Sequence, residues 1–162
     1  KRQHLKLTKS GLNLAYIAKG GKKVRRRLTD RKLLRVLNEV RDLPGATLLT
    51  WTDDDGTARR LSSGALNAYL AEAGGGEFTA KTFRTWSGTL AAFEAAETDR
   101  LTIRAMSEAA AERLANTPTV ARNAYIHPKV IALTETGPAT AEPAQLSGLS
   151  AAENRLLGYL ET

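Results

Sequence analysis

The spacing between apolar residues changes once along the chain, close to residue 29, and this change limits the fold more than any other feature. Before it, apolar and polar residues alternate, as at Leu5 and Leu7 and again at Leu12 and Leu14, which is the period of a strand with one buried face. After it, apolar residues recur three or four positions apart, the period of an amphipathic helix. The sequence therefore predicts an α+β fold, with an N-terminal three-stranded β-meander followed by a mainly α-helical bundle.

Turn-forming and helix-capping residues predict where these elements begin and end. Glycines favour tight turns between the strands at residues 9–11 and 19–22. Further along, capping and breaking residues predict helices over residues 30–44, 62–73, 79–93 and 101–114, a short strand over residues 47–51 and a short helix that ends before Tyr125. Two prolines among Ala, Thr and Gly predict a linker over residues 136–148, followed by a C-terminal helix over residues 149–162.

The positive charge is concentrated at one end of the chain. The net charge is +7, but residues 1–41 contain 14 Lys and Arg against 2 acidic residues, whereas residues 42–162 contain 10 against 15. The first segment therefore carries +12 and the remainder −5. A dense basic segment indicates a polyanionic partner, most simply nucleic acid. A solvated basic face is equally compatible with the charge alone.

Several kinds of site are excluded or disfavoured by what the sequence lacks. It has no cysteine, which excludes disulfides, thiolate zinc sites and cysteine nucleophiles, and only two histidines, His4 and His127. The glycine run over residues 74–76 lacks the pattern of a phosphate-binding loop, so a nucleotide site has little support. No apolar run approaches the ~20 residues that cross a bilayer. We expect no metal, cofactor or membrane partner, and the reducing cytoplasm as the compartment.

Three stretches of the chain occur in the order found in one known family. Residues 16–24 read YIAKGGKKV, residues 81–89 read KTFRTWSGT, and residues 114–128 read LANTPTVARNAYIHP. They resemble three segments of type IB DNA topoisomerases. In the same order, these are the hairpin that carries the catalytic lysine, the segment around a catalytic arginine, and the segment that ends in the nucleophilic tyrosine. Over residues 1–135 the chain looks like the catalytic domain of a bacterial, poxvirus-like member of that family.

This resemblance implies phosphoryl transfer on duplex DNA without metal or ATP. Such enzymes relax supercoils by breaking one strand through a 3′-phosphotyrosyl link and then resealing it. Tyr125 would be the nucleophile, and Arg84 would bind the non-bridging phosphate oxygens, which a planar guanidinium can contact through two parallel hydrogen bonds. Asn116, nine residues before Tyr125, stands where poxvirus members carry histidine. Its amide can donate a hydrogen bond to the phosphate but cannot shuttle a proton.

The resemblance also implies roles for basic residues. Lys19 would be the general acid that protonates the departing 5′-oxygen, with Lys22 and Lys23 as rivals for that role. The other residues expected to contact DNA are Arg25 in the same hairpin and Lys81 further along the chain. An alternative is that this basic turn acts only through its electrostatic field and contains no general acid.

Each candidate also has a structural interpretation. An alternative for Arg84 is a surface salt bridge, although its position between Phe83 and Trp86, on a helix expected to be otherwise buried, argues against it. Asn116 begins Asn-Thr-Pro, which is an ordinary helix stop. His127 is interpreted as structural. The remaining tyrosines lie in apolar patterns and are expected to be buried and structural: Tyr16, Tyr69 and Tyr159.

Two other functions stay open. A tyrosine recombinase shares the nucleophile and the fold core, but recombinases usually show His-x-x-Arg, whereas residues 81–84 begin with lysine. A non-enzymatic DNA-binding module would account for the basic segment. The family also uses an earlier arginine, on a helix before the meander, for which the chain shows no counterpart. We therefore expect a monomeric, truncated catalytic domain with weak or no activity, from a nucleoid-associated enzyme.

Overall fold

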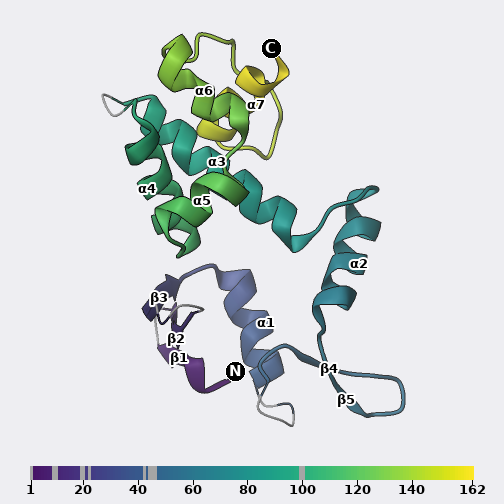
Figure 1. Ribbon diagram of the computed structural model, residues 1–162. Coiled ribbons are helices and arrows are strands. Elements are labelled where there is room, and N and C mark those ends of the chain that lie inside the picture. Colours follow the sequence, from purple (N-terminus) through teal and green to yellow (C-terminus); the bar gives the residue numbers. More distant parts are fainter. Residues whose placement is uncertain are drawn as a thin grey trace. The chain divides into compact units, whose positions relative to one another are not determined.

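The chain forms two units, residues 1–75 (unit 1) and residues 76–162 (unit 2). The structure, a computed structural model, describes residues 2–8, 11–18, 21, 23–41, 43, 47–98 and 101–162. Strands occur in unit 1, and the described part of unit 2 is helical (Figure 1). The predicted α+β class is thus confirmed. Within the described residues, no helix is long and apolar enough to span a membrane.

Unit 1 begins with the predicted meander. A 3₁₀ turn, η1 (Arg2–His4), leads into a three-stranded antiparallel sheet in the order β1-β2-β3, formed by β1 (Leu5–Thr8), β2 (Gly11–Ile17) and β3 (Lys23–Leu28). Residues 9, 10, 19, 20 and 22, which belong to the two predicted turns, lie outside the described residues.

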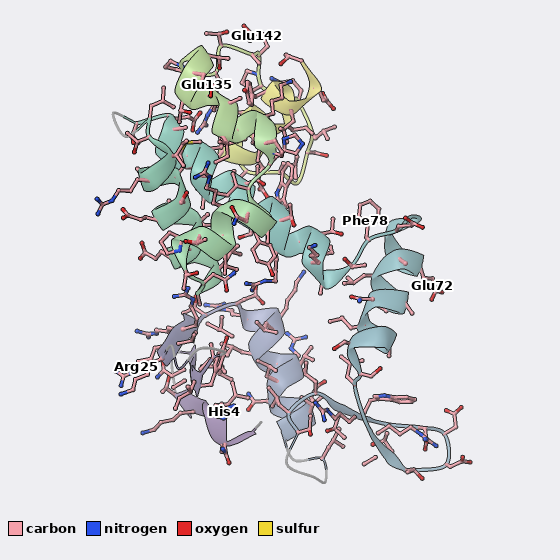
Figure 2. All side chains as sticks on the ribbon, viewed as in Figure 1. His4, Arg25, Glu72, Phe78, Glu135 and Glu142 are labelled. Carbon is pink, nitrogen blue, oxygen red and sulfur yellow. The ribbon has the colours of Figure 1, made fainter. Side chains whose placement is uncertain are left out.

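The register of the sheet gives it one apolar and one basic face. Leu12 pairs with Leu28, and Tyr16 pairs with Val24, so these side chains share a face, on which Leu12 and Val24 are buried. Because side chains alternate along a strand, the opposite face carries the exposed basic residues Lys6, Lys23, Arg25 and Arg27. Arg25 projects away from the strands (Figure 2). Four basic side chains of the N-terminal segment thus share one face of the sheet.

The rest of unit 1 contains two helices and a hairpin. Helix α1 (Arg31–Arg41) is capped by Asp30, whose Oδ1 accepts a hydrogen bond from the Leu33 N–H at 2.7 Å. The predicted short strand is shifted to β4 (Thr50–Thr52) and pairs with a strand that was not predicted, β5 (Ala58–Arg60). Helix α2 (Ser63–Gly74) begins at the Ser62 cap and ends at Gly75, which takes the left-handed conformation.

Unit 2 packs four helices around a fifth. Helix α3 contacts all the others, and the bounds are α3 (Ala80–Ala96), α4 (Ile103–Leu114), α5 (Pro118–Tyr125), α6 (Pro128–Thr136) and α7 (Ala151–Glu161). Helix α6 was not predicted. Each of these helices contributes buried residues to the core, and its largest fully buried side chains are Phe93, Met106, Val130, Leu133 and Leu156. Burial of these apolar side chains is the main force that holds the helices together.

Polar contacts attach helix α7 to α3. Arg155 donates two hydrogen bonds to the Glu97 carboxylate, at 2.5 and 2.7 Å. Glu153 belongs to the predicted capping box with Ser150 and also accepts a hydrogen bond from Trp86 Nε1 at 3.1 Å. Hydrogen bonds from the Ser150 backbone and side chain, and then from Trp86, lower the pKa of Glu153. The C-terminal helix is therefore part of unit 2 and contributes Leu156 to its core.

We predict that Gly158→Ala destabilises unit 2 by about 1–3 kcal/mol, since overpacking forces the backbone to shift. Gly158 is buried, and a Cβ there would lie 2.0 Å from the carbonyl oxygen of Glu142. The control is Gly64→Ala in helix α2, where the nearest atom is 3.8 Å away. That change should be neutral or stabilising by about 1 kcal/mol. Urea unfolding followed by circular dichroism measures both, and an unchanged midpoint for Gly158→Ala would contradict the packing.

We predict that Ala115→Gly stabilises the protein by about 1 kcal/mol. Ala115 follows helix α4 with φ 57°, a left-handed conformation that strains a residue with a Cβ. The conformation is held because the next residue, Asn116, donates its backbone N–H to the carbonyl of Ala111 at 2.9 Å. The same change at Ala124, exposed within helix α5, should instead cost about 1 kcal/mol. A loss of stability in Ala115→Gly would rule out the strain.

Candidate active site

Helix α3 carries the predicted arginine. The helix begins at the Thr79 cap, where Thr79 and Thr82 form a capping box, and Arg84 lies in its second turn. The expectation that this helix is otherwise buried is wrong for its first half. Residues 81–84 are exposed, and Phe83 is 58% exposed, whereas the buried run begins only at Gly88. The reason is that the other helices pack on the second half of α3, so the first half extends beyond the core.

Tyr125 is the last residue of helix α5 and is half-buried. The next residue, Ile126, leaves the helical conformation (φ −111°, ψ 128°) and enters the core, where it is buried. This change of direction leaves Tyr125 at the edge of the core. The guanidinium carbon of Arg84 lies 5.1 Å from the centroid of the Tyr125 ring. The structure therefore brings together the predicted nucleophile and the predicted phosphate-binding cation, which are 41 residues apart.

Arg84 also contacts the end of helix α4. Its Nη2 donates a hydrogen bond to the carbonyl oxygen of Leu114 at 3.1 Å. The last carbonyls of a helix carry partial negative charge, so a guanidinium is favourable there. Asn116 follows Leu114 by two residues, and its side-chain nitrogen is buried. The third predicted residue therefore lies in the turn that directly follows the carbonyl bound by Arg84.

Two neighbours in helix α3 contact the backbone of Tyr125, and the motif pattern alone did not give them a role. Thr89 donates its hydroxyl to the Tyr125 carbonyl at 3.3 Å and accepts a hydrogen bond from the His127 N–H at 3.0 Å. A Cβ added at Gly88 would lie 2.7 Å from that same carbonyl oxygen. A glycine in the middle of a helix is the sequence signal that could have identified this contact, because it often marks close packing.

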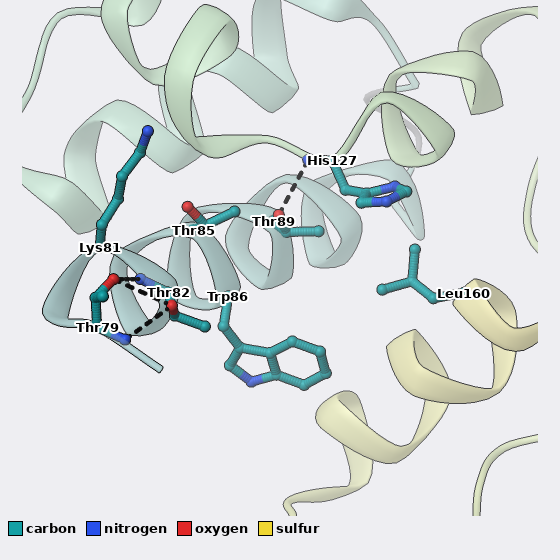
Figure 3. Close-up of a pocket in the computed structure, with 8 residues that line it drawn as sticks. All are labelled: Thr79, Lys81, Thr82, Thr85, Trp86, Thr89, His127 and Leu160. Carbon is teal, nitrogen blue, oxygen red and sulfur yellow. Dashed lines mark hydrogen bonds between the residues drawn. The ribbon is translucent and has the colours of Figure 1, made fainter. Parts of the chain in front are cut away.

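Lys81 is exposed in the first turn of α3, three residues before Arg84. It borders a cavity of about 360 Å³ between the first half of α3, the start of α6 and the end of α7 (Figure 3). His127 lines the same cavity and caps α6, because its Nδ1 accepts a hydrogen bond from the Lys129 N–H at 3.2 Å. That is the geometry of a structural histidine. The full lining is Thr79, Lys81, Thr82, Thr85, Trp86, Thr89, His127 and Leu160.

The predicted hairpin residues belong to unit 1. Lys23 and Arg25 are exposed on strand β3, on the basic face of the sheet. Lys19 and Lys22 lie outside the described residues. The assignment of the general acid to Lys19 therefore stays a prediction.

The remaining tyrosines have different surroundings. Tyr159 stacks on Phe93 with ring centroids 5.7 Å apart and donates its hydroxyl to the Lys129 carbonyl at 2.9 Å. Burial raises the pKa of Tyr159. Tyr16 is half-buried on β2. The expectation of a buried Tyr69 is wrong, because it is 66% exposed on α2, a helix with no buried residue.

A model of one known family matches most of the chain. A family model described as "Eukaryotic DNA topoisomerase I, catalytic core" matches residues 3–133, which include every predicted site residue of both units. No curated protein matches the chain. Since the family match covers most of the chain and ends beyond Tyr125, the chain belongs to the catalytic-core family of DNA topoisomerase I, the type IB topoisomerases, whose substrate is DNA.

Proposed function

We propose that the chain is a catalytic domain for the relaxation of supercoiled duplex DNA through a 3′-phosphotyrosyl intermediate, without metal or ATP, and that its activity by itself is weak. The observation that carries this proposal is the position of the Arg84 guanidinium, 5.1 Å from the Tyr125 ring centroid, in a chain of the topoisomerase family. A phenol that can attack phosphorus and a cation that can hold phosphate oxygens are adjacent before DNA is bound.

In the proposed cleavage step, the Tyr125 hydroxyl oxygen attacks a backbone phosphorus and loses its proton to water, and the bond from phosphorus to the 5′-oxygen breaks. The Lys19 ammonium donates a proton to that oxygen, so the strand leaves with a 5′-hydroxyl. After the nicked duplex rotates, the 5′-hydroxyl attacks the phosphorus and returns a proton to Lys19, while the bond from phosphorus to the Tyr125 oxygen breaks and that oxygen takes a proton from water. The phosphotyrosyl bond retains the energy of the phosphodiester, so the cycle consumes no nucleotide.

Arg84 and Asn116 are proposed to stabilise the charge that develops on the phosphate. A guanidinium has five N–H donors in a fixed fork, and the described contact with the Leu114 carbonyl involves only Nη2. Two donors aligned with the non-bridging oxygens would offset the negative charge of the transition state. Asn116 would add one amide hydrogen bond. The motif resemblance supports a bacterial, poxvirus-like enzyme, in which Asn116 stands where the poxvirus members themselves carry histidine.

The basic face of the sheet is proposed to bind the DNA backbone. It presents Lys23, Arg25 and Arg27 on one strand, and Lys19 and Lys22 precede that strand in the sequence. Contacts of this kind give binding that weakens steeply with salt and depends little on sequence. Lys81 would add a contact beside Arg84. We propose a monomer that acts on chromosomal DNA in the bacterial cytoplasm.

We predict that the chain forms a covalent adduct with DNA through Tyr125. The substrate is a duplex with a very short segment downstream of the break, so the 5′-hydroxyl fragment dissociates and even slow cleavage accumulates as adduct. Denaturing gel electrophoresis detects the adduct. Tyr125→Phe should abolish it, whereas Tyr69→Phe, at an exposed tyrosine, should leave it unchanged. DNA that binds without any adduct in the wild-type chain would indicate a DNA-binding module instead.

We predict that Lys19→Ala slows cleavage by about 10²–10⁴-fold, the usual contribution of a general acid. Sulfur in place of the bridging 5′-oxygen should restore the rate, because a thiolate leaves without being protonated. Arg84→Ala, which removes charge stabilisation worth about 10²–10³-fold, should not be rescued by this substrate. Parallel tests of Lys22→Ala and Lys23→Ala identify the acid directly. Rescue of one of these variants, with Lys19→Ala unaffected by sulfur, would contradict the assignment to Lys19.

A further inference from the structure

Thr89 is a buried polar residue that the proposed reaction does not use. Its exposed fraction is 2%, in the part of helix α3 that faces the core. Its hydroxyl accepts a hydrogen bond from the His127 N–H at 3.0 Å and donates one to the Tyr125 carbonyl at 3.3 Å. Figure 3 shows the bond to His127 among the residues that line the cavity. One hydroxyl thus binds the peptide groups on both sides of Ile126.

These two peptide groups lie where a helix cannot provide their partners. Tyr125 is the last residue of α5, so its carbonyl is among those that the helix leaves unpaired. His127 is the cap of α6, so its N–H precedes the hydrogen bonds of that helix. Since the chain at Ile126 is extended between the two helices, Thr89 from α3 fixes the backbone at the point where α5 ends.

Gly88 allows helices α3 and α5 to come into direct contact. A Cβ at this position would lie 2.7 Å from the Tyr125 carbonyl oxygen, 3.2 Å from the Tyr125 Cβ and 2.9 Å from Leu114 Cδ1. Any larger residue would therefore move the tyrosine backbone or the end of α4 away from α3. Gly88 follows Arg84 by four residues, so the two positions lie on the same face of the helix, one turn apart.

We infer that Gly88 and Thr89 are positioning residues that set the distance between the Tyr125 hydroxyl and the phosphate held by Arg84. The expected effect on cleavage rests on the proposed function, whereas the contacts of Gly88 and Thr89 with the Tyr125 backbone do not. The cation and both anchors of the nucleophile lie on one rigid helix, in two successive turns. Loss of the Thr89 hydroxyl releases the backbone of Tyr125 without touching the phosphate, so it slows cleavage and leaves DNA affinity unchanged. A displacement of about 1 Å can cost about 10²-fold in rate.

The test compares Thr89→Val, which keeps the side-chain volume but removes the hydroxyl, with Thr89→Ser, which keeps the hydroxyl. Without DNA, amide hydrogen exchange at His127 is measured by NMR. With DNA, the cleavage rate constant is measured in a single turnover at saturating substrate, and the dissociation constant is measured separately. If Thr89→Val does not fold, Thr89→Ala replaces it in both measurements.

In Thr89→Val we expect faster exchange at His127, about 10²-fold slower cleavage and an unchanged dissociation constant for DNA. In Thr89→Ser we expect the exchange rate and the cleavage rate to return to the wild-type values. Unchanged exchange at His127, or slow cleavage in Thr89→Ser as well, would overturn the inference. A rate that falls only in proportion to DNA affinity would also overturn it. Faster exchange at His127 in Thr89→Val, together with no DNA adduct in the wild-type chain, would support the hydrogen bonds of Thr89. That result would contradict only the proposed function.

Discussion

The guanidinium of Arg84 is the contact on which the arrangement of the candidate site depends. It is carried by α3, donates to the last carbonyls of α4 through Leu114, and lies over the ring of Tyr125 at the end of α5. Two helix ends are thus held beside a cation. Residues 81–84, near the start of α3, are exposed, so the charges of Lys81 and Arg84 reach solvent. The site is therefore rigid on one side and open to a large polyanion on the other.

Elements whose formation depends on residues close together in the sequence are predictable from the sequence. The meander follows from the alternation of apolar residues, and its register places Lys6, Lys23, Arg25 and Arg27 on one face. The caps at Asp30, Thr79 and Ser150 are predictable because a capping side chain bonds to backbone only three residues away. The motifs around Arg84 and Tyr125 gave the candidate residues by resemblance, and the fold places them together.

Features that depend on tertiary packing are not predictable in this way. Strand β5 has three residues, too few for a period, and exists through its pairing with β4. The exposure of Phe83 and Tyr69 reflects which helix faces have partners, which an apolar pattern does not reveal. The contact of Gly88 and Thr89 with the tyrosine backbone spans more than 35 residues. It emerges only when α3 and α5 are packed together.

The central claim is that Tyr125, at the end of α5 beside Arg84, is the residue that becomes joined to DNA. Mass spectrometry of peptides from nuclease-trimmed adduct tests it most directly. We expect a nucleotide joined through its 3′-phosphate to the peptide that contains Tyr125. A link on Tyr16, Tyr69 or Tyr159, or a link through a 5′-phosphate, would contradict it.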